Sequence, residues 1–272
     1  MRRRETQRGR PLTLQFPVLS FMADTEDQLS LTGLCRVLQD AAWQHAIQLG
    51  FGPEDLAERG LLWVLSRLLV RVERYPRWSQ TVSVETWPSG VERLFAMRDF
   101  RLTCDGEPVA TVRSAWLGID AATRRPMPPA RFIDVDAYRD AETVFPDLPE
   151  KLTPLGPESG LSPVGTHQVV YSDFDRQRHV NNVQYLQWML DTFDLDFQQR
   201  SVASELTINF LAEASFGETV DLYRRDIAAA SEVTVVSPAP DSPAAPNRSA
   251  ASAATDASGL PVAAARIVWR PR

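Results

Sequence analysis

The sequence has few lysines, and few of the cysteines and histidines that build metal and redox sites. Its 272 residues include one lysine, Lys151, two cysteines and three histidines. Cys35 and Cys104 lie far apart and follow no metal or redox spacing, so we expect both to be buried free thiols in a reducing compartment, the cytoplasm. Three histidines without a cysteine pair argue against a zinc site, and no metal is predicted.

Long apolar runs and an excess of positive charge are also missing. No run of 18 or more apolar residues occurs, so no membrane span is predicted. The formal net charge of −6 argues against nucleic acid as a partner. Residues 1–12 are basic without an apolar stretch and predict a disordered arm. Residues 237–258, rich in Pro, Ala and Ser, predict a flexible loop between two strands.

The first half of the chain alternates between one helical pattern and several strand patterns. Residues 30–49 carry an apolar stripe at helical spacing, and His45 on that stripe is expected to be a hydrogen-bonded core residue. A strand is predicted at 13–22, and period-two patterns predict further strands at 61–72, 81–87, 93–104 and 108–119. Asp105-Gly106 is a hairpin turn signal. One long helix followed by an antiparallel meander is an α+β arrangement.

The second half repeats this order. After a Pro-rich connection with a short helix near 133–141, strands are predicted at 166–171, 205–210, 218–224 and 261–269, and a helix at 180–192. The stretch LCRVLQDAA at 34–42 is similar to YLQWMLDTF at 185–193, and WSQTV at 78–82 to FGETV at 216–220. We infer an internal duplication, divided as 13–125, a linker at 126–163, and 164–272.

The richest polar cluster precedes the second predicted helix. The stretch YSDFDRQRHVNNVQYLQWMLD begins at Tyr171 and places carboxylate, imidazole and carboxamide groups at a helix N-terminus. Free backbone N–H groups and the helix dipole there can stabilise an oxyanion. Helix capping is the ordinary use of such residues, and a lone histidine near a helix start is more often structural than catalytic. The first copy has no His or Asn in the matching stretch, Asp24 to Leu31.

This stretch resembles the signature of acyl-acyl carrier protein thioesterases, in which a strand ends in an S-D-L-D-x-N-x-H-V-N-N-x-x-Y-x-x-W pattern. The resemblance extends over nearly the whole chain except 1–12 and 237–258. It implies a tandem (double) hotdog, each half a long helix wrapped by an antiparallel β-sheet. It also implies hydrolysis of the fatty acyl thioester of acyl carrier protein (ACP) without any cofactor.

Four side chains inherit catalytic roles from this resemblance. They are Asp175, Gln177, His179 and Glu213. Gln177 stands where the family has Asn, which keeps the amide but extends it by one methylene. Ala214 stands where plant members have Cys, so a cysteine nucleophile has no support.

The absence of a nucleophile motif favours direct attack by water. Glu213 or Asp175 would be the general base, with His179 polarising the carbonyl or holding the water. Gln177 would orient the water or the substrate, and backbone N–H groups of Val180 and Asn181 would stabilise the oxyanion.

An apolar pocket for the acyl chain is predicted among first-half strands. Its candidate lining residues are Trp63, Leu65, Phe95, Met97 and Trp116, each of which could instead be plain core. An acyl-CoA thioesterase of the same fold and a non-catalytic acyl-binding sensor remain alternative functions. A double hotdog is already a pseudo-dimer, and pairing into a homodimer stays open.

Overall fold

The computed structural model describes residues 10–138, 140–238 and 259–272, and the chain divides into two compact units, Met1–Glu150 and Lys151–Arg272. The predicted arm at 1–12 and loop at 237–258 fall mostly outside the described residues. The predicted linker at 126–163 contains the boundary, but its residues up to Glu150 belong to the first unit.

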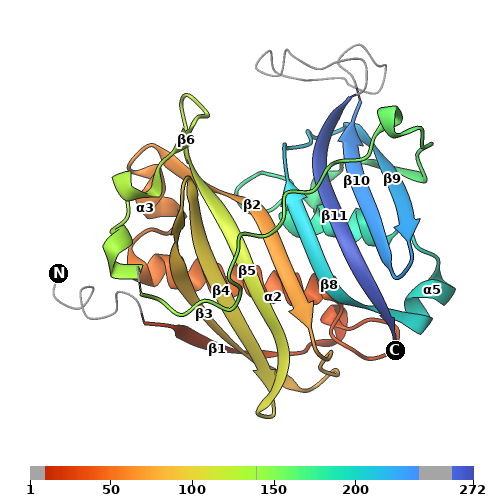
Figure 1. Cartoon of the computed structure of the whole chain (residues 1–272), viewed down its shortest axis with the longest axis horizontal. Helices are drawn as coiled ribbons and strands as arrows, with labels where there is room; N and C mark the ends of the chain where they lie inside the picture. The colour runs from red at the N-terminus through yellow and green to blue at the C-terminus, as the bar shows by residue number, and fades with distance from the viewer. Residues whose placement is uncertain (1–9, 139, 239–258) are drawn as a thin grey trace. The chain divides into compact units, whose positions relative to one another are not determined.

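The first unit is an antiparallel sheet with one long helix against it (Figure 1). The strand order is β1-β3-β4-β5-β2, and the short β6 (Pro126–Met127) pairs with β5. The strands are β1 (Leu12–Pro17), β2 (Leu61–Val72), β3 (Thr81–Glu92), β4 (Phe95–Cys104) and β5 (Glu107–Asp120). Helix α2 (Leu31–Leu49) begins at Ser30, whose hydroxyl accepts from Gly33 N, and ends at Gly50 with φ 77°.

The second unit repeats this plan in the order β8-β11-β10-β9-β7 (Figure 1). Its strands are β7 (Gly165–Gln168), β8 (Ser201–Phe210), β9 (Thr219–Ile227), β10 (Ala230–Ser237) and β11 (Leu260–Pro271). Helix α4 (Asn182–Leu190) packs against β10, and its buried face includes Val183, Leu186 and Met189. Each unit is therefore a hotdog, and the predicted double hotdog is confirmed.

The duplication is visible in the backbone hydrogen bonds. Val18 N donates to Gln80 O in the first unit, and Val169 N donates to Glu218 O in the second. The loops inferred to correspond also share a left-handed residue, Ser79 (φ 68°) in one and Gly217 (φ 78°) in the other. The internal repeat predicted from sequence is confirmed at this level.

Several predicted boundaries were wrong. The strand predicted at 13–22 ends at Pro17, and the one predicted at 166–171 ends at Gln168. In both places the chain enters a 3-10 turn, η1 (Ser20–Met22) or η5 (Tyr171–Asp173), whose apolar residues prolong the strand-like pattern. The short helices α3 (Pro53–Ala57) and α5 (Leu195–Arg200) were not predicted, and the helix expected at 133–141 is a 3-10 turn, η3 (Val135–Tyr138).

The face of the first sheet that is turned toward α2 holds a buried cation. Arg98 Nη1 lies 3.0 Å from His45 Nδ1 and 3.1 Å from Thr86 Oγ1, and both Arg98 and His45 are buried. Burial lowers the pKa of Arg98 to about 10, so it stays charged at neutral pH. Burial and then the Arg98 charge lower the pKa of His45 to about 3, so His45 is neutral. The predicted core role of His45 is confirmed.

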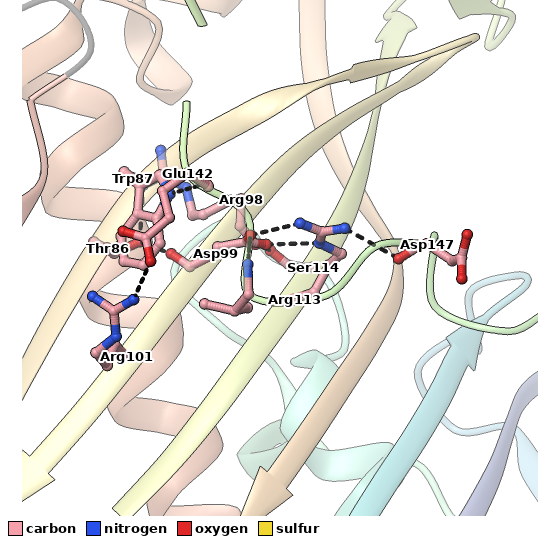
Figure 2. Close-up of polar contacts among 10 residues, drawn as sticks. Thr86, Trp87, Arg98, Asp99, Arg101, Arg113, Ser114, Glu142 and Asp147 are labelled. Carbon is pink, nitrogen blue, oxygen red and sulfur yellow. Dashed lines mark hydrogen bonds and ion pairs between the residues drawn. The ribbon is translucent and has the colours of Figure 1, made fainter. Parts of the chain in front are cut away.

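The opposite, outer face of this sheet is covered by residues 142–149, the covering segment. Beneath it, Asp99 and Arg113 form a bidentate ion pair, with Arg113 Nε 2.8 Å from Asp99 Oδ1 and Nη2 2.6 Å from Oδ2. Asp99 Oδ2 also accepts from Val144 N, and Arg113 Nη1 donates to Asp147 O (Figure 2). Neighbouring contacts are Trp87 Nε1 to Glu142 O and Arg67 Nη1 to Pro149 O. Residues 142–149 of the predicted linker are thus a layer of the first unit.

Removing Asp99 should destabilise the protein strongly. Asp99 is 0 % and Arg113 3 % exposed, so Asp99→Ala leaves a buried guanidinium without its counter-ion. Such a change typically costs about 3–5 kcal/mol, measurable as the free energy of unfolding in urea. Glu85→Gln, which breaks a half-exposed ion pair with Arg101, is the control and should cost less than about 1 kcal/mol. Equal free energies of unfolding for the two variants would contradict the buried ion pair between Asp99 and Arg113.

His45 should make stability depend on pH. Because its folded pKa of about 3 lies below the usual value of 6.5, its contribution is complete above pH 6.5 and is lost as the pH falls toward 3. Between pH 7 and pH 5 the loss should be about 2 kcal/mol. The free energy of unfolding is measured by urea titration at both pH values. In His45→Gln its decrease from pH 7 to pH 5 should be smaller by about 2 kcal/mol. An unchanged decrease would refute the neutral buried imidazole.

Candidate active site

The polar cluster folds into a closed turn between Phe174 and Val180, which form an isolated antiparallel bridge. Asp175 N donates to His179 O at 2.9 Å, and Arg178, with φ 64°, donates from its N–H to Asp175 O. The Asp175 Oδ1 accepts from Gln177 N at 2.8 Å and from His179 N at 3.3 Å. The Asp175 carboxylate therefore holds the turn that presents His179.

His179 meets Glu213, which follows β8 by three residues. His179 Nδ1 and Glu213 Oε1 are 2.5 Å apart, and the two side chains are 48 % and 41 % exposed. Both groups can therefore be reached from outside the unit. The pair brings together residues 34 positions apart in the sequence.

The backbone next to Glu213 is fixed by two further side chains. Ala214 N donates to Tyr185 Oη on α4 at 3.0 Å, and Ser215 N donates to Glu218 Oε2 at 2.7 Å. Burial raises the pKa of Tyr185 well above its usual range, so the phenol is neutral. Tyr185 thus ties the Glu213 loop to the same helix that begins at the His179 turn.

The first unit has the same turn without the same chemistry. Asp24 Oδ1 accepts from Glu26 N and Gln28 N, and Asp24 N donates to Gln28 O. Asp27 has a positive φ of 55°, and Arg178 in the second turn has a positive φ of 64°. Gln28 corresponds to His179, and Tyr75 to Glu213. Because Asp24 closes a turn that carries no histidine, closing the turn is a sufficient reason for Asp175.

The two predicted oxyanion donors differ in their surroundings. Asn181 N donates to Asp173 O at 2.9 Å, and the Asn181 side chain accepts from Val183 N as the N-cap of α4. The Asn181 N–H is therefore not available to a substrate in this structure, which corrects that expectation. Leu29 N donates to Pro76 O in the first unit, but its counterpart Val180 N meets no carbonyl among the described backbone groups. Val180 remains a candidate donor.

The predicted pocket residues do not share one face of the sheet. Leu65 pairs with Trp116, and Trp63 packs on Phe51 and Phe132 on the helix side. Phe95 stacks against Arg67 on the outer face. The register places Met97 opposite Ala115, also on that face. Phe95 and Met97 therefore cannot line a pocket with the other three.

The Gln177 side chain is exposed on the turn, where its backbone N–H contacts Asp175. Cys35 and Cys104 are buried free thiols, and burial raises the pKa of Cys35 to about 12. Among the residues with assigned positions, no three His, Cys, Asp or Glu side chains gather as a metal site would require. No helix in the described part of the chain has the length and apolarity needed to cross a membrane.

Sequence reasoning gave no role to His167 and Asp173. His167 Nε2 lies 2.9 Å from Asp173 Oδ2, and the imidazole stacks on Trp188. Asp173 stood within the polar cluster, but nothing in the sequence pairs it with a residue of the preceding strand. Only the fold shows that the Asp173 carboxylate is buried and therefore needs a partner.

Family models match both units. The model described as acyl-ACP thioesterase N-terminal domain matches residues 10–130, and the C-terminal domain model matches residues 162–269. A dodecanoyl-[acyl-carrier-protein] hydrolase of Cinnamomum camphora is 31% identical over 222 residues, which cover 74% of this chain and 55% of the relative. A palmitoyl-acyl carrier protein thioesterase of Arabidopsis thaliana is 27% identical, covering 77% and 54%. The chain spans about half the length of these curated relatives.

Solved structures agree over nearly the whole chain. An acyl-ACP thioesterase from Bacteroides thetaiotaomicron superposes with a TM-score of 0.81 at 25% identity, covering 98% of this chain and 99% of that one. A 12:0-ACP thioesterase from Umbellularia californica superposes with a TM-score of 0.78 at 23% identity, covering 96% and 98%. The second likeness bears on the fold alone.

Proposed function

Because the chain belongs to the acyl-ACP thioesterase family, we propose that it hydrolyses the thioester between a fatty acyl group and the phosphopantetheine arm of ACP. The observation that carries this proposal is the His179–Glu213 pair beside the N-terminus of α4. The first unit of the chain has the same turn but neither the histidine nor the glutamate, so it serves as an internal comparison. The products are a free fatty acid and the ACP thiol.

The geometry favours His179 as the group that accepts the proton. In this scheme Glu213 Oε1 accepts from His179 Nδ1–H, and Nε2 is the imidazole atom that takes the water proton. The water oxygen bonds to the thioester carbon, and the carbon–sulfur bond then breaks. The imidazolium returns its proton to the departing sulfur, and the Val180 N–H faces the developing oxyanion. Glu213 orients the base in this scheme and stabilises its charged form.

Asp175 is less suited to act as the base. Its Oδ1 already accepts two backbone N–H groups, and Asp24 plays the same part in a turn without a histidine. Gln177 can contact the water or the substrate through its exposed amide. Trp63, Leu65 and Trp116 remain candidates for the acyl pocket, and a cytoplasmic location stays a prediction.

Replacing either member of the pair should abolish most turnover. Thiol release is measured for one set of acyl chains on ACP and on CoA, with His179→Ala and Glu213→Ala beside wild type. We expect kcat/KM on acyl-ACP to fall at least about 100-fold in both variants, since a positioned base supplies roughly 10²–10⁴-fold. Gln28→Ala, at the matching position of the first copy, should stay within about twofold.

The same assay separates the alternative functions. Faster hydrolysis of the CoA esters would make the protein an acyl-CoA thioesterase. No hydrolysis on either carrier, with acyl ligands still bound, would favour a binding protein. Normal rates in His179→Ala would remove the pair from the mechanism.

Asp175→Asn should distinguish a turn residue from a base. Asparagine keeps an oxygen that can accept both backbone N–H groups but cannot take a proton from water. We expect kcat to stay within about fivefold of wild type, because a base would be worth at least about 100-fold. A hundredfold loss with an unchanged melting temperature would instead make Asp175 the base.

A further inference from the structure

A second histidine–carboxylate pair lies directly behind the candidate active site. His167, on β7, contacts Asp173 in η5 through Nε2 and Oδ2 at 2.9 Å. The same oxygen accepts from Val170 N at 2.8 Å, and the Asp173 side chain is 6 % exposed. The imidazole stacks on Trp188 with ring centroids 4.3 Å apart and planes 24° apart. The proposed hydrolysis uses none of these groups.

This pair is connected to the His179 turn through Asp173. The Asp173 carboxylate is held by His167, while its main-chain carbonyl accepts from Asn181 N at 2.9 Å. Asn181 in turn caps α4 and follows His179 by two residues. A shift of Asp173 would therefore move the end of the turn that carries the imidazole.

The same pair is connected to Glu213 through the aromatic side chains of α4. His167 stacks on Trp188, whose ring meets Tyr185 edge-on at 4.9 Å. Tyr185 Oη accepts from Ala214 N, next to Glu213. His167 and Asp173 are therefore linked to both partners: to His179 through Asn181, and to Glu213 through Trp188 and Tyr185.

The first unit provides the comparison, because its backbone corresponds residue by residue. The positions of His167, Asp173, Tyr185 and Trp188 are occupied there by Phe16, Met22, Leu34 and Val37. All four are apolar, and the first turn has neither the histidine nor the glutamate. Since four apolar residues suffice to build the same turn, folding of the turn does not explain the polar and aromatic residues of the second unit.

We propose that His167 and Asp173 are positioning residues that set the orientation of His179 against Glu213. The proposal rests on the proposed function for its catalytic consequence. His167 donates from Nε2–H to the Asp173 carboxylate, which fixes η5, and its ring restrains Trp188. Neither residue contacts the reacting atoms in this scheme, so their removal acts on kcat through geometry.

The test replaces His167 and Asp173 by the residues that the first unit has at the matching positions. The double variant H167F/D173M should fold, because Phe16 and Met22 occupy these positions in the first unit, but its kcat on acyl-ACP should fall about tenfold. KM should change less than about twofold, because substrate contacts are untouched. H167Q, which keeps a donor for Asp173, should recover kcat to within about threefold of wild type.

A readout independent of turnover is the imidazole ¹⁵N spectrum, which is simple because the chain has three histidines. Loss of the Nδ1–Glu213 hydrogen bond should shift the His179 signal in H167F/D173M and leave it in place in H167Q. An unmoved signal with unchanged kcat overturns the proposal, as does H167Q behaving like the double variant. If wild type hydrolyses nothing, the proposed function fails while the ¹⁵N signals still decide the positioning role. If the double variant does not fold, H167F alone is measured in its place.

Discussion

Both units depend on one closed turn that joins a short 3-10 segment to the start of the central helix. In each, an aspartate carboxylate accepts two backbone N–H groups, a residue at positive φ reverses the chain, and a polar side chain caps the helix. Backbone polar groups at a helix start must be paired when they are close to a core. This constraint is met identically in the two copies, so the turn is first a device of folding.

Because the turn is satisfied by backbone and aspartate alone, the remaining positions are free to differ. The second copy places His179 on it and brings Glu213 to 2.5 Å, and the first copy places Gln28 and Tyr75 there. The surrounding residues differ as well: the second copy has polar and aromatic side chains where the first has an apolar set. The His179–Glu213 pair is therefore not needed to close the turn.

The sequence predicted the long elements well, because helical and alternating patterns are local properties. Helix 30–49 and the strand at 61–72 match α2 and β2 to within a residue. It could not predict which sheet face a side chain occupies, since that depends on register. A bulge between Leu65 and Arg67 shifts the alternation, so Leu65 and Leu68 share the helix face. Residue types at the site came from a motif, whereas the His167–Asp173 contact depends on how β7 lies against η5.

The covering segment changes where the two copies can be said to separate. Composition placed the join at 126–163, but Pro149 O still accepts from Arg67 in the first unit, and Leu152 N already donates to Asn209 in the second. Only residues 150–151 lie between these two contacts. A fragment of the first copy that ended at residue 125 would lack the covering segment and would expose the Asp99–Arg113 pair to water. Any attempt to exchange or recombine the halves with those of a relative must cut within this dipeptide, because a cut on either side leaves one half without contacts that belong to it.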